Sequence, residues 1–408
     1  MKKTKKVLIN IVIMMLVSFT LTSFAFADYS KSEATTIYKQ TKVTELKAKA
    51  YALLDCATGK TVFKNNEKEH INVGYLSQLM TLFVTYERCS EGKFKSDAIV
   101  TVSKEAQAAS NGKARVFLDA GKKEVISVDQ AIKAVAICNA VDAAYALGEF
   151  VGGTVEDFVK MMNDKAKEIG MTDSLFTDPT GADREGQYTC ASDLVTLGKL
   201  FIEKYPEILE YTKLTYGEFK HDSTGQPFTA MVSPNNLTRG KFYTESDGLG
   251  VGFSENSGYA MLATVEVEEK RVIACVLGEE DENYRAAEIK KLLEYGLSNF
   301  EYRIVSQKGT FVRRVNVVDG KKKRVDIYTA EDFGVILEKS QFKNLKHDIV
   351  MYGQVTAPVA ADTEVGEIVY TVDGEEVGKV KIVCTEKIER ANWFTRLIRK
   401  ILKWLGLD

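Results

Sequence analysis

The pattern of apolar residues changes near residue 304, and this change most constrains the fold. Before it, segments with helical periodicity, such as the alanine-rich Val128 to Phe150, lie between short segments of strand character. After it come only short β-prone segments separated by turns such as Asp319-Gly320 and Asp373-Gly374. The sequence therefore predicts an α+β domain followed by a small all-β domain.

Strand segments at both ends of the first domain, with helical segments between them, predict an antiparallel sheet flanked by helices over residues 28–303. The expected strands are Lys47 to Leu54, Thr61 to Lys64, Gly258 to Val267 and Arg271 to Leu277. The expected helices are Tyr75 to Cys89, Val128 to Phe150, Val155 to Ile169, Ala191 to Lys204 and Tyr284 to Phe300. Ser192 or Asp193 is expected to cap the helix from Ala191. The small all-β domain is expected over residues 304–385, with strands at Thr310 to Val318, Arg324 to Tyr328, Asp348 to Gln354, Gly366 to Val372 and Gly378 to Val383.

Residues 1–27 have the three parts of a secretory signal. A cationic start is followed by an apolar run from Val7 and by the small-x-small site Ala25-Phe26-Ala27. The cationic residues are Lys2, Lys3, Lys5 and Lys6. An uncleaved anchor is the alternative, since the run from Val7 to Ala27 is nearly long enough to span a bilayer. Polar residues late in the run favour cleavage and export.

Residues 386–408 predict a basic amphipathic helix. Apolar residues recur along one stripe between Trp393 and Leu407, and cationic residues lie on the other face. The cationic residues are Arg396, Arg399, Lys400 and Lys403. Such a helix lies in the plane of a membrane surface, which places the chain at the extracytoplasmic face of the cytoplasmic membrane. Docking of the helix on the protein's own core is the alternative.

The charge and the metal-ligating residues exclude several classes of protein. The net charge of −2 gives no basic field for nucleic acid. His70, His221 and His347 lie far apart, and no Cys/His cluster has metal-ligand spacing, so neither a metal nor a cofactor is predicted. The six cysteines show no paired spacing, and we expect isolated buried thiols.

Several framework segments are typical of one family. They are Arg115 to Leu118, Phe158 to Met171, Phe176 to Asp193 with its Asp178-Pro179-Thr180-Gly181 turn, and the strand from Gly258 into Val276-Leu277-Gly278. In these segments and their order the chain resembles the serine-type D-Ala-D-Ala carboxypeptidases, the low-molecular-mass penicillin-binding proteins. The resemblance implies a DD-peptidase/β-lactamase-like fold and covers nearly the whole chain.

Family catalysis depends on three motifs, and the first is altered here. In Ser-x-x-Lys, the lysine takes the proton of the nucleophilic serine one helical turn away. The family run aligns with Val73 to Thr81, which puts Tyr75 at the nucleophile position and Gln78 at the base position. A phenol is a poor acyl acceptor, and an amide cannot take a proton. We expect Tyr75 and Gln78 to fill the old cleft and to hydrogen-bond to each other or to Asn139.

The second and third motifs are altered as well. The family's Ser-Gly-Asn reads Asn139-Ala140-Val141, which replaces the relay hydroxyl and the substrate-binding amide. The family's Lys-Thr-Gly, which binds the terminal carboxylate of the substrate and forms part of the oxyanion hole from an edge strand, reads Gly250-Val251-Gly252. The flanking Leu79-Met80-Thr81, Asp142-Ala143 and Asp247-Gly248-Leu249 keep the alignment in register.

The other candidate nucleophiles lack the context that the family chemistry needs. Ser-x-x-Lys recurs at Ser90/Lys93, Ser110/Lys113 and Ser340/Lys343, but none of these pairs begins a helix of the expected kind. Cys138 adjoins the second motif, although no histidine is near it in the sequence.

Three functions therefore remain open. The first is a non-catalytic homologue that binds peptidoglycan stem peptides or wall proteins. The second is an active carboxypeptidase that trims the terminal D-Ala of pentapeptide stems. The third is a structural scaffold with an occluded groove. Whether Tyr75, Gln78, Asn139 and Val251 converge in an open cleft distinguishes among them.

Overall fold

The computed structural model describes residues 46–109, 114–240 and 243–404. The predicted signal segment 1–27 and the Ser110/Lys113 pair lie outside the described residues.

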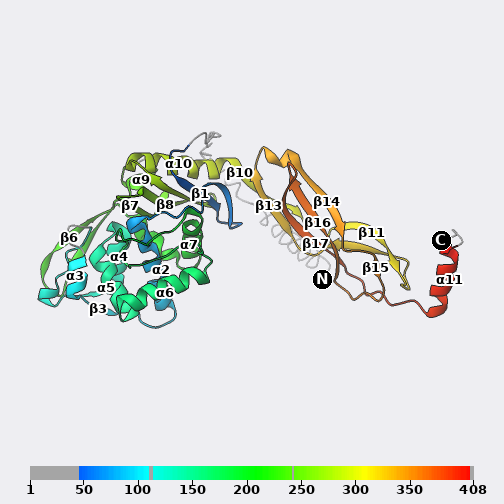
Figure 1. Ribbon diagram of the computed structural model, residues 1–408, viewed down its shortest axis with the longest axis horizontal. Helices are drawn as coiled ribbons and strands as arrows, with labels where there is room; N and C mark the ends of the chain where they lie inside the picture. The colour runs from blue at the N-terminus through cyan, green and yellow to red at the C-terminus, as the bar shows by residue number, and fades with distance from the viewer. Residues whose placement is uncertain (1–45, 110–113, 241–242, 405–408) are drawn as a thin grey trace, which may run out of the picture. The chain divides into compact units, whose positions relative to one another are not determined.

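A five-stranded antiparallel sheet forms the centre of the first domain in the described part of the chain, in the order β2-β1-β9-β8-β7 (Figure 1). Its strands are β1 (Ala50–Asp55), β2 (Lys60–Asn65), β7 (Ser246–Ser254), β8 (Gly258–Val267) and β9 (Lys270–Glu279). The sequence predicted four of these strands. Strands β8 and β9 are buried along most of their length because helices cover both faces of the sheet. Strand β7 is an edge strand.

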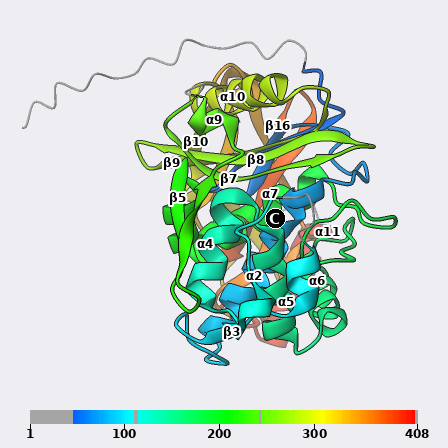
Figure 2. The same ribbon diagram turned by 90° about the vertical axis from the view of Figure 1, so that its left-hand side faces the viewer.

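Different helices cover the two faces of this sheet. One face packs on α2, α4, α5, α6 and α7, and the other packs on α10, as the two core clusters show. In Figure 2, α10 lies above β7 and β8, and α2, α4, α5 and α6 lie below them. The helices are η1 (Gly74–Ser77), α2 (Gln78–Ser90), α3 (Lys104–Ala109), η2 (Ala120–Lys122), α4 (Val128–Cys138), α5 (Val141–Gly152), α6 (Val155–Glu168), α7 (Ala191–Lys204), η3 (Pro206–Ile208), α8 (Leu209–Thr212), α9 (Asn236–Arg239) and α10 (Glu282–Asn299). Two short strand pairs complete the domain: β3 (Ile99–Thr101) with β4 (Val125–Ser127), and β5 (Tyr216–His221) with β6 (Gln226–Val232).

Two local predictions were wrong. The single helix expected over Val128 to Phe150 is broken into α4 and α5, because Asn139 adopts the left-handed conformation (φ 56°) that ends α4. The expected cap of α7 by Ser192 or Asp193 is absent, since Cys190 is the N-cap residue and provides no side-chain hydrogen bond. Asp193 instead accepts hydrogen bonds from the Asp173 amide (2.9 Å) and the Ser174 hydroxyl (2.7 Å).

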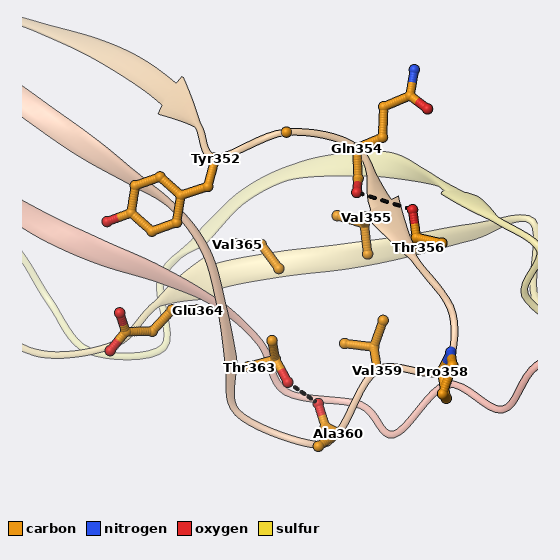
Figure 3. A pocket seen from close by; sticks show the side chains of 11 residues that line it. Tyr352, Gln354, Val355, Thr356, Pro358, Val359, Ala360, Thr363, Glu364 and Val365 are labelled. Atoms are coloured by element: carbon orange, nitrogen blue, oxygen red, sulfur yellow. Dashed lines mark hydrogen bonds between the residues drawn. The ribbon is translucent and has the colours of Figure 1, made fainter.

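The second domain is all-β, as predicted. A six-stranded sheet has the order β14-β16-β17-β12-β11-β15, and β10 pairs with β13, among the described strands. The elements are β10 (Phe300–Ser306), β11 (Phe311–Val318), β12 (Arg324–Thr329), β13 (Phe333–Glu338), η4 (Gln341–Asn344), β14 (Leu345–Met351), β15 (Val355–Thr356), β16 (Thr363–Val372) and β17 (Glu375–Cys384). Strands β10, β13 and β15 were not predicted. A hollow of about 220 Å³ lies where the chain turns after β14, beside Tyr352, Pro358 and Val365 (Figure 3).

Helix α11 (Trp393–Trp404) presents its apolar stripe outward. The exposed fractions are 69% for Trp393, 47% for Leu397, 48% for Ile401 and 84% for Trp404. Its cationic face makes the contacts with the chain, because Arg399 donates to the Gly320 carbonyl (2.6 Å). Among the described residues, no helix combines the length and the apolar character needed to cross a lipid bilayer.

Candidate functional site

The site lies where η1 and the start of α2 pack against the edge strand β7. Gly74 permits this contact, since a Cβ built on it would lie 2.0 Å from the Phe253 carbonyl oxygen. Tyr75 follows on η1 with its side chain half-buried, and burial raises the pKa of its phenol. No described residue hydrogen-bonds the Tyr75 hydroxyl, so the expected bond to Gln78 does not form.

Gln78 is the first residue of α2 and is 2% exposed. Its Nε2 donates to the carbonyl oxygens of Thr180 (2.7 Å) and Asn139 (3.3 Å). These two acceptors fix the orientation of the amide, because the reverse orientation would place Oε1 against two carbonyls. Gln78 Oε1 is consequently buried with no hydrogen-bond partner among the described residues. The base position therefore holds a neutral, immobile group.

The turn at residues 178–181 supplies one of these acceptors. Asp178 Oδ1 accepts from the Thr180 amide (2.6 Å) in an Asx-type turn. The turn aims the Thr180 carbonyl at Gln78, and it aims the Pro179 carbonyl at Thr81 Oγ1 (2.7 Å). Gly181 lies against η1, where a Cβ would meet Gly74 O at 2.6 Å and Tyr75 Cα at 2.8 Å. The sequence identified this turn as framework and gave no indication that its carbonyls hold the base position.

Asn139 connects the helical part of the site to the sheet. Its Nδ2 donates to the Val251 carbonyl (3.0 Å), 112 residues away in the sequence. The left-handed backbone of Asn139 directs its side chain out of the α4–α5 junction, and asparagine tolerates this conformation better than most residues. The Val251 carbonyl on the edge strand β7 is thus already occupied by a hydrogen bond from within the chain.

Strand β7 alternates its side chains between the two faces of the sheet. Gly250 and Gly252 face η1, where a Cβ on Gly252 would lie 1.9 Å from the Val73 carbonyl oxygen. Val251 points the other way into the core beneath α10 and is 3% exposed. At Gly250, Val251 and Gly252, the positions aligned with the family motif, β7 therefore contributes backbone atoms to the site and no side chain.

Val141 and Asp142 hold the neighbouring segment in place. The buried Val141 donates its amide to the Ala114 carbonyl (2.9 Å). The Asp142 carboxylate accepts from the amides of Val116 (3.2 Å) and Leu118 (3.1 Å), on either side of Phe117. Burial raises the pKa of Asp142, and these backbone bonds partly offset the rise. Phe117 is 56% exposed and has a left-handed backbone (φ 63°).

Asp183 closes one end of the site and was not predicted. Its carboxylate accepts from Asn72 Nδ2 (2.7 Å), from Ser254 Oγ (2.9 Å) and from the Glu255 amide (3.0 Å). It therefore joins the loop after the 178–181 turn to the end of β7. The residues it connects are far apart in the sequence, and no local pattern predicts such contacts.

The alternative nucleophiles are not activated. Cys138 Sγ donates to the Ala134 carbonyl (3.2 Å), and burial, aided by the nearby Asp142, raises the pKa of the thiol to about 12. Ser90 ends α2 and bonds the Glu87 carbonyl (2.7 Å). Ser340 lies near Glu338 Oε2 (3.3 Å) in the all-β domain. All six cysteines are free thiols, of which Cys190, Cys275 and Cys384 are fully buried.

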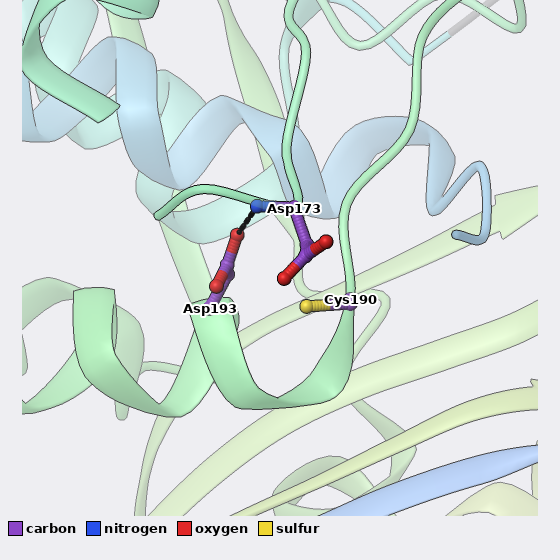
Figure 4. A group of neighbouring side chains, drawn as sticks. All are labelled: Asp173, Cys190 and Asp193. Carbon is purple, nitrogen blue, oxygen red and sulfur yellow. Dashed lines mark hydrogen bonds between the residues drawn. The ribbon is translucent and has the colours of Figure 1, made fainter. Parts of the chain in front are cut away.

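Asp173, Cys190 and Asp193 bring their ligating atoms within 4.8 Å of one another (Figure 4). Asp193 Oδ2 already accepts two hydrogen bonds from the 173–174 loop. Burial raises the pKa of the Cys190 thiol to about 11, and the thiol contacts Ser192 Oγ at 3.2 Å. A protonated thiol is a poor metal ligand. The group anchors the loop to the start of α7.

Comparisons with known proteins agree on one family. The family described as D-alanyl-D-alanine carboxypeptidase matches residues 36–281, and the penicillin-binding protein 5 C-terminal domain matches residues 300–390. The chain is 30% identical to the D-alanyl-D-alanine carboxypeptidase DacF of Bacillus subtilis (strain 168), over 96% of this chain and 97% of that protein. It is 31% identical to DacC of Escherichia coli (strain K12), over 88% and 90% of the two chains.

Solved structures share the fold. The D-alanyl-D-alanine carboxypeptidase DacD from Francisella tularensis superposes with a TM-score of 0.74 at 22% identity, covering 87% of this chain and 97% of that one. Penicillin-binding protein 5 from Haemophilus influenzae gives a TM-score of 0.71 at 25% identity, covering 86% and 99%. The α+β domain, the all-β domain and the C-terminal helix follow the same architecture.

Substitution of Asn139 tests the contact between the helices and the sheet. Asn139→Ala removes the bond to the Val251 carbonyl and disfavours the left-handed backbone, so we expect it to lower the free energy of unfolding by about 2 kcal/mol. Asn139→Gly keeps the backbone conformation and should lose about 1 kcal/mol. Urea denaturation of the full chain measures both. An Asn139→Gly protein as stable as the wild type would show that the side-chain bond contributes nothing.

Proposed function

This chain belongs to the D-alanyl-D-alanine carboxypeptidase family, and we propose that it is a non-catalytic member that binds peptidoglycan stem peptides or wall proteins. Members of the family act in the periplasm or at the cell wall. The proposal has two parts, the loss of acyl transfer and the retention of a binding edge.

The environment of Gln78 carries the first part. Acyl transfer requires a hydroxyl with a base within hydrogen-bond reach. The only nitrogen of the Gln78 side chain donates to two backbone carbonyls, and an amide accepts no proton at neutral pH. The raised pKa of Tyr75 keeps its phenol protonated. The described site therefore supplies neither a nucleophile nor a base.

The remaining motif positions support the same conclusion. Asn139 replaces the relay hydroxyl and bonds the sheet instead. Gly250 replaces the cation that would bind a terminal carboxylate, and the Val251 side chain lies in the core on the far face of the sheet. Catalytic groups of this kind act as a unit, so the loss of a single one already removes most of the rate enhancement. Replacement of all of them leaves no basis for the family mechanism.

The edge of β7 supports the second part. No described strand pairs with its outer side, and an extended peptide can add to such an edge through backbone hydrogen bonds. The bond from Asn139 to the Val251 carbonyl favours the scaffold alternative, because a bound peptide has to displace it.

The C-terminal helix supports attachment to a membrane surface. Its apolar stripe is exposed while Arg396 and Arg399 contact Asp319 and the Gly320 carbonyl. Docking on the protein's own core would bury the stripe. Outward tryptophans at both ends, Trp393 and Trp404, suit the interfacial region of a bilayer. Together with the predicted signal, this supports a position at the extracytoplasmic face of the membrane.

Covalent labelling with a fluorescent penicillin tests the loss of chemistry. We expect no labelling of the wild type, of Tyr75→Ser or of Gln78→Lys, because each lacks a nucleophile, a base or both. The double variant Tyr75→Ser/Gln78→Lys restores both groups and should label slowly. Stoichiometric labelling of the wild type would refute the proposal and favour an active carboxypeptidase.

Titration with stem pentapeptides, followed by NMR, tests binding. Because positions 75, 78 and 250 carry no charge, peptides ending in a D-Ala carboxylate or in its amide should bind with similar affinity. Asn139→Ala frees the Val251 carbonyl and should strengthen binding. If neither peptide shifts resonances near Tyr75 in either protein, the scaffold alternative replaces stem binding.

Sedimentation with vesicles containing an anionic phospholipid tests the membrane surface. Leu397→Glu places a charge within the exposed stripe and should weaken binding about tenfold or more. Thr395→Glu introduces the same charge outside the stripe and serves as the control. Equal loss in both variants would mean that charge alone, rather than insertion of the stripe, holds the helix to lipid.

A further inference from the structure

The all-β domain has an open sheet edge at β14. This strand is the terminal strand of its sheet and pairs only with β16 among the described residues. The Tyr352 amide donates to the Val365 carbonyl (3.1 Å), which continues the ladder with β16. Since backbone direction alternates along a strand, the amides and carbonyls of Leu345, His347 and Ile349 point to the open side. The Leu345 amide donates to the Phe342 carbonyl at the end of η4. The amides of His347 and Ile349 and the carbonyls of all three residues have no partner in the described part of the chain.

A groove runs beside this edge. It has a volume of about 430 Å³ and is lined from β10, β11, β14 and β16. His347 and Ile349 lie on its β14 side, and Ile304 and Phe311 on its rim are 54% and 55% exposed. Leu345 and Ile349 face the core of the domain, whereas Lys346 and Asp348 point out from the opposite face. The edge thus combines free backbone groups with exposed apolar surface.

The sequence of β14 is complementary to itself in antiparallel orientation. Around His347, the order is apolar Leu345, basic Lys346, acidic Asp348 and apolar Ile349. Neither Lys346 nor Asp348 has an ion-pair or hydrogen-bond partner within the described residues. A single charge on an edge strand prevents pairing, but two opposite charges placed symmetrically about one residue favour pairing with a second copy.

We propose that β14 pairs antiparallel with β14 of a second copy of this chain, with His347 on the two-fold axis. In this register the two copies of His347 exchange backbone hydrogen bonds, and the Ile349 amide of each copy donates to the Leu345 carbonyl of the other. Lys346 of each copy lies opposite Asp348 of the other, at the positions where side chains approach most closely. Centring the pair on Lys346 or on Asp348 would instead place like charges opposite each other. Leu345 of the second copy lies opposite Ile349 and covers the rim of the groove.

Sedimentation equilibrium of the purified full chain tests the charge pairing. We expect a reversible dimer that Lys346→Asp or Asp348→Lys weakens about tenfold or more, because each change places like charges opposite each other twice. The double variant Lys346→Asp/Asp348→Lys makes the charges complementary again and should restore the dimer. Lys381→Asp, on β17 away from the edge, is the control and should dimerise normally. A monomeric wild type, or no recovery in the double variant, would overturn the proposal.

Cysteine cross-linking tests the register. Opposed residues at the axis have Cα atoms about 5.5 Å apart, within the range of a disulfide. His347→Cys should therefore give a disulfide-linked dimer on mild oxidation. Val350→Cys places the two thiols about 20 Å apart and should not. Association that survives Lys346→Asp and is lost in Leu397→Glu would assign the dimer to α11 and refute pairing through β14.

Discussion

The contact between η1 and strand β7 determines the geometry of the whole site. Three backbone segments meet there without side chains between them, because a Cβ on Gly74, Gly181 or Gly252 would overlap backbone at 2.8 Å or less. This contact places Tyr75 beside the edge strand and directs Gln78 toward the Thr180 carbonyl. A side chain at any of the three glycines would separate the helices from the sheet. The arrangement is a property of backbone packing and requires no catalytic residue.

The residues that keep the family pattern have structural roles that do not depend on catalysis. Thr81 bonds the Pro179 carbonyl, Asp142 holds the amides of Val116 and Leu118, and Asp247 pairs with Arg271 at 2.7 Å. The replaced positions, such as Gln78 and Gly250, are those where the family uses a side chain for chemistry. The fold therefore does not depend on the side chains at these positions, and a similar overall structure says nothing about activity.

Much of the fold could be predicted because periodicity is a local property. Helices α6, α7 and α10 follow the apolar pattern to within about two residues. Strand β7 alternates Gly248, Gly250 and Gly252 with Leu249, Val251 and Phe253. Glycine is disfavoured inside strands, so only the motif resemblance identified this one. The break at Asn139 depends on one residue within an alanine-rich segment, and its bond to Val251 spans 112 residues. Contacts of that range depend on the tertiary fold and cannot be inferred from the sequence.

The electrostatics of position 78 favour a neutral amide over a lysine. A lysine at this buried position would be desolvated, whereas the neutral amide avoids that cost and donates to two carbonyls. The exchange leaves Gln78 Oε1 buried and unpaired, which costs about 1–3 kcal/mol. An apolar side chain would avoid this cost but would remove the donor that the Thr180 and Asn139 carbonyls share. The two bonds from Nε2 join the 178–181 turn to the end of α4, so packing within the fold accounts for a polar amide at position 78.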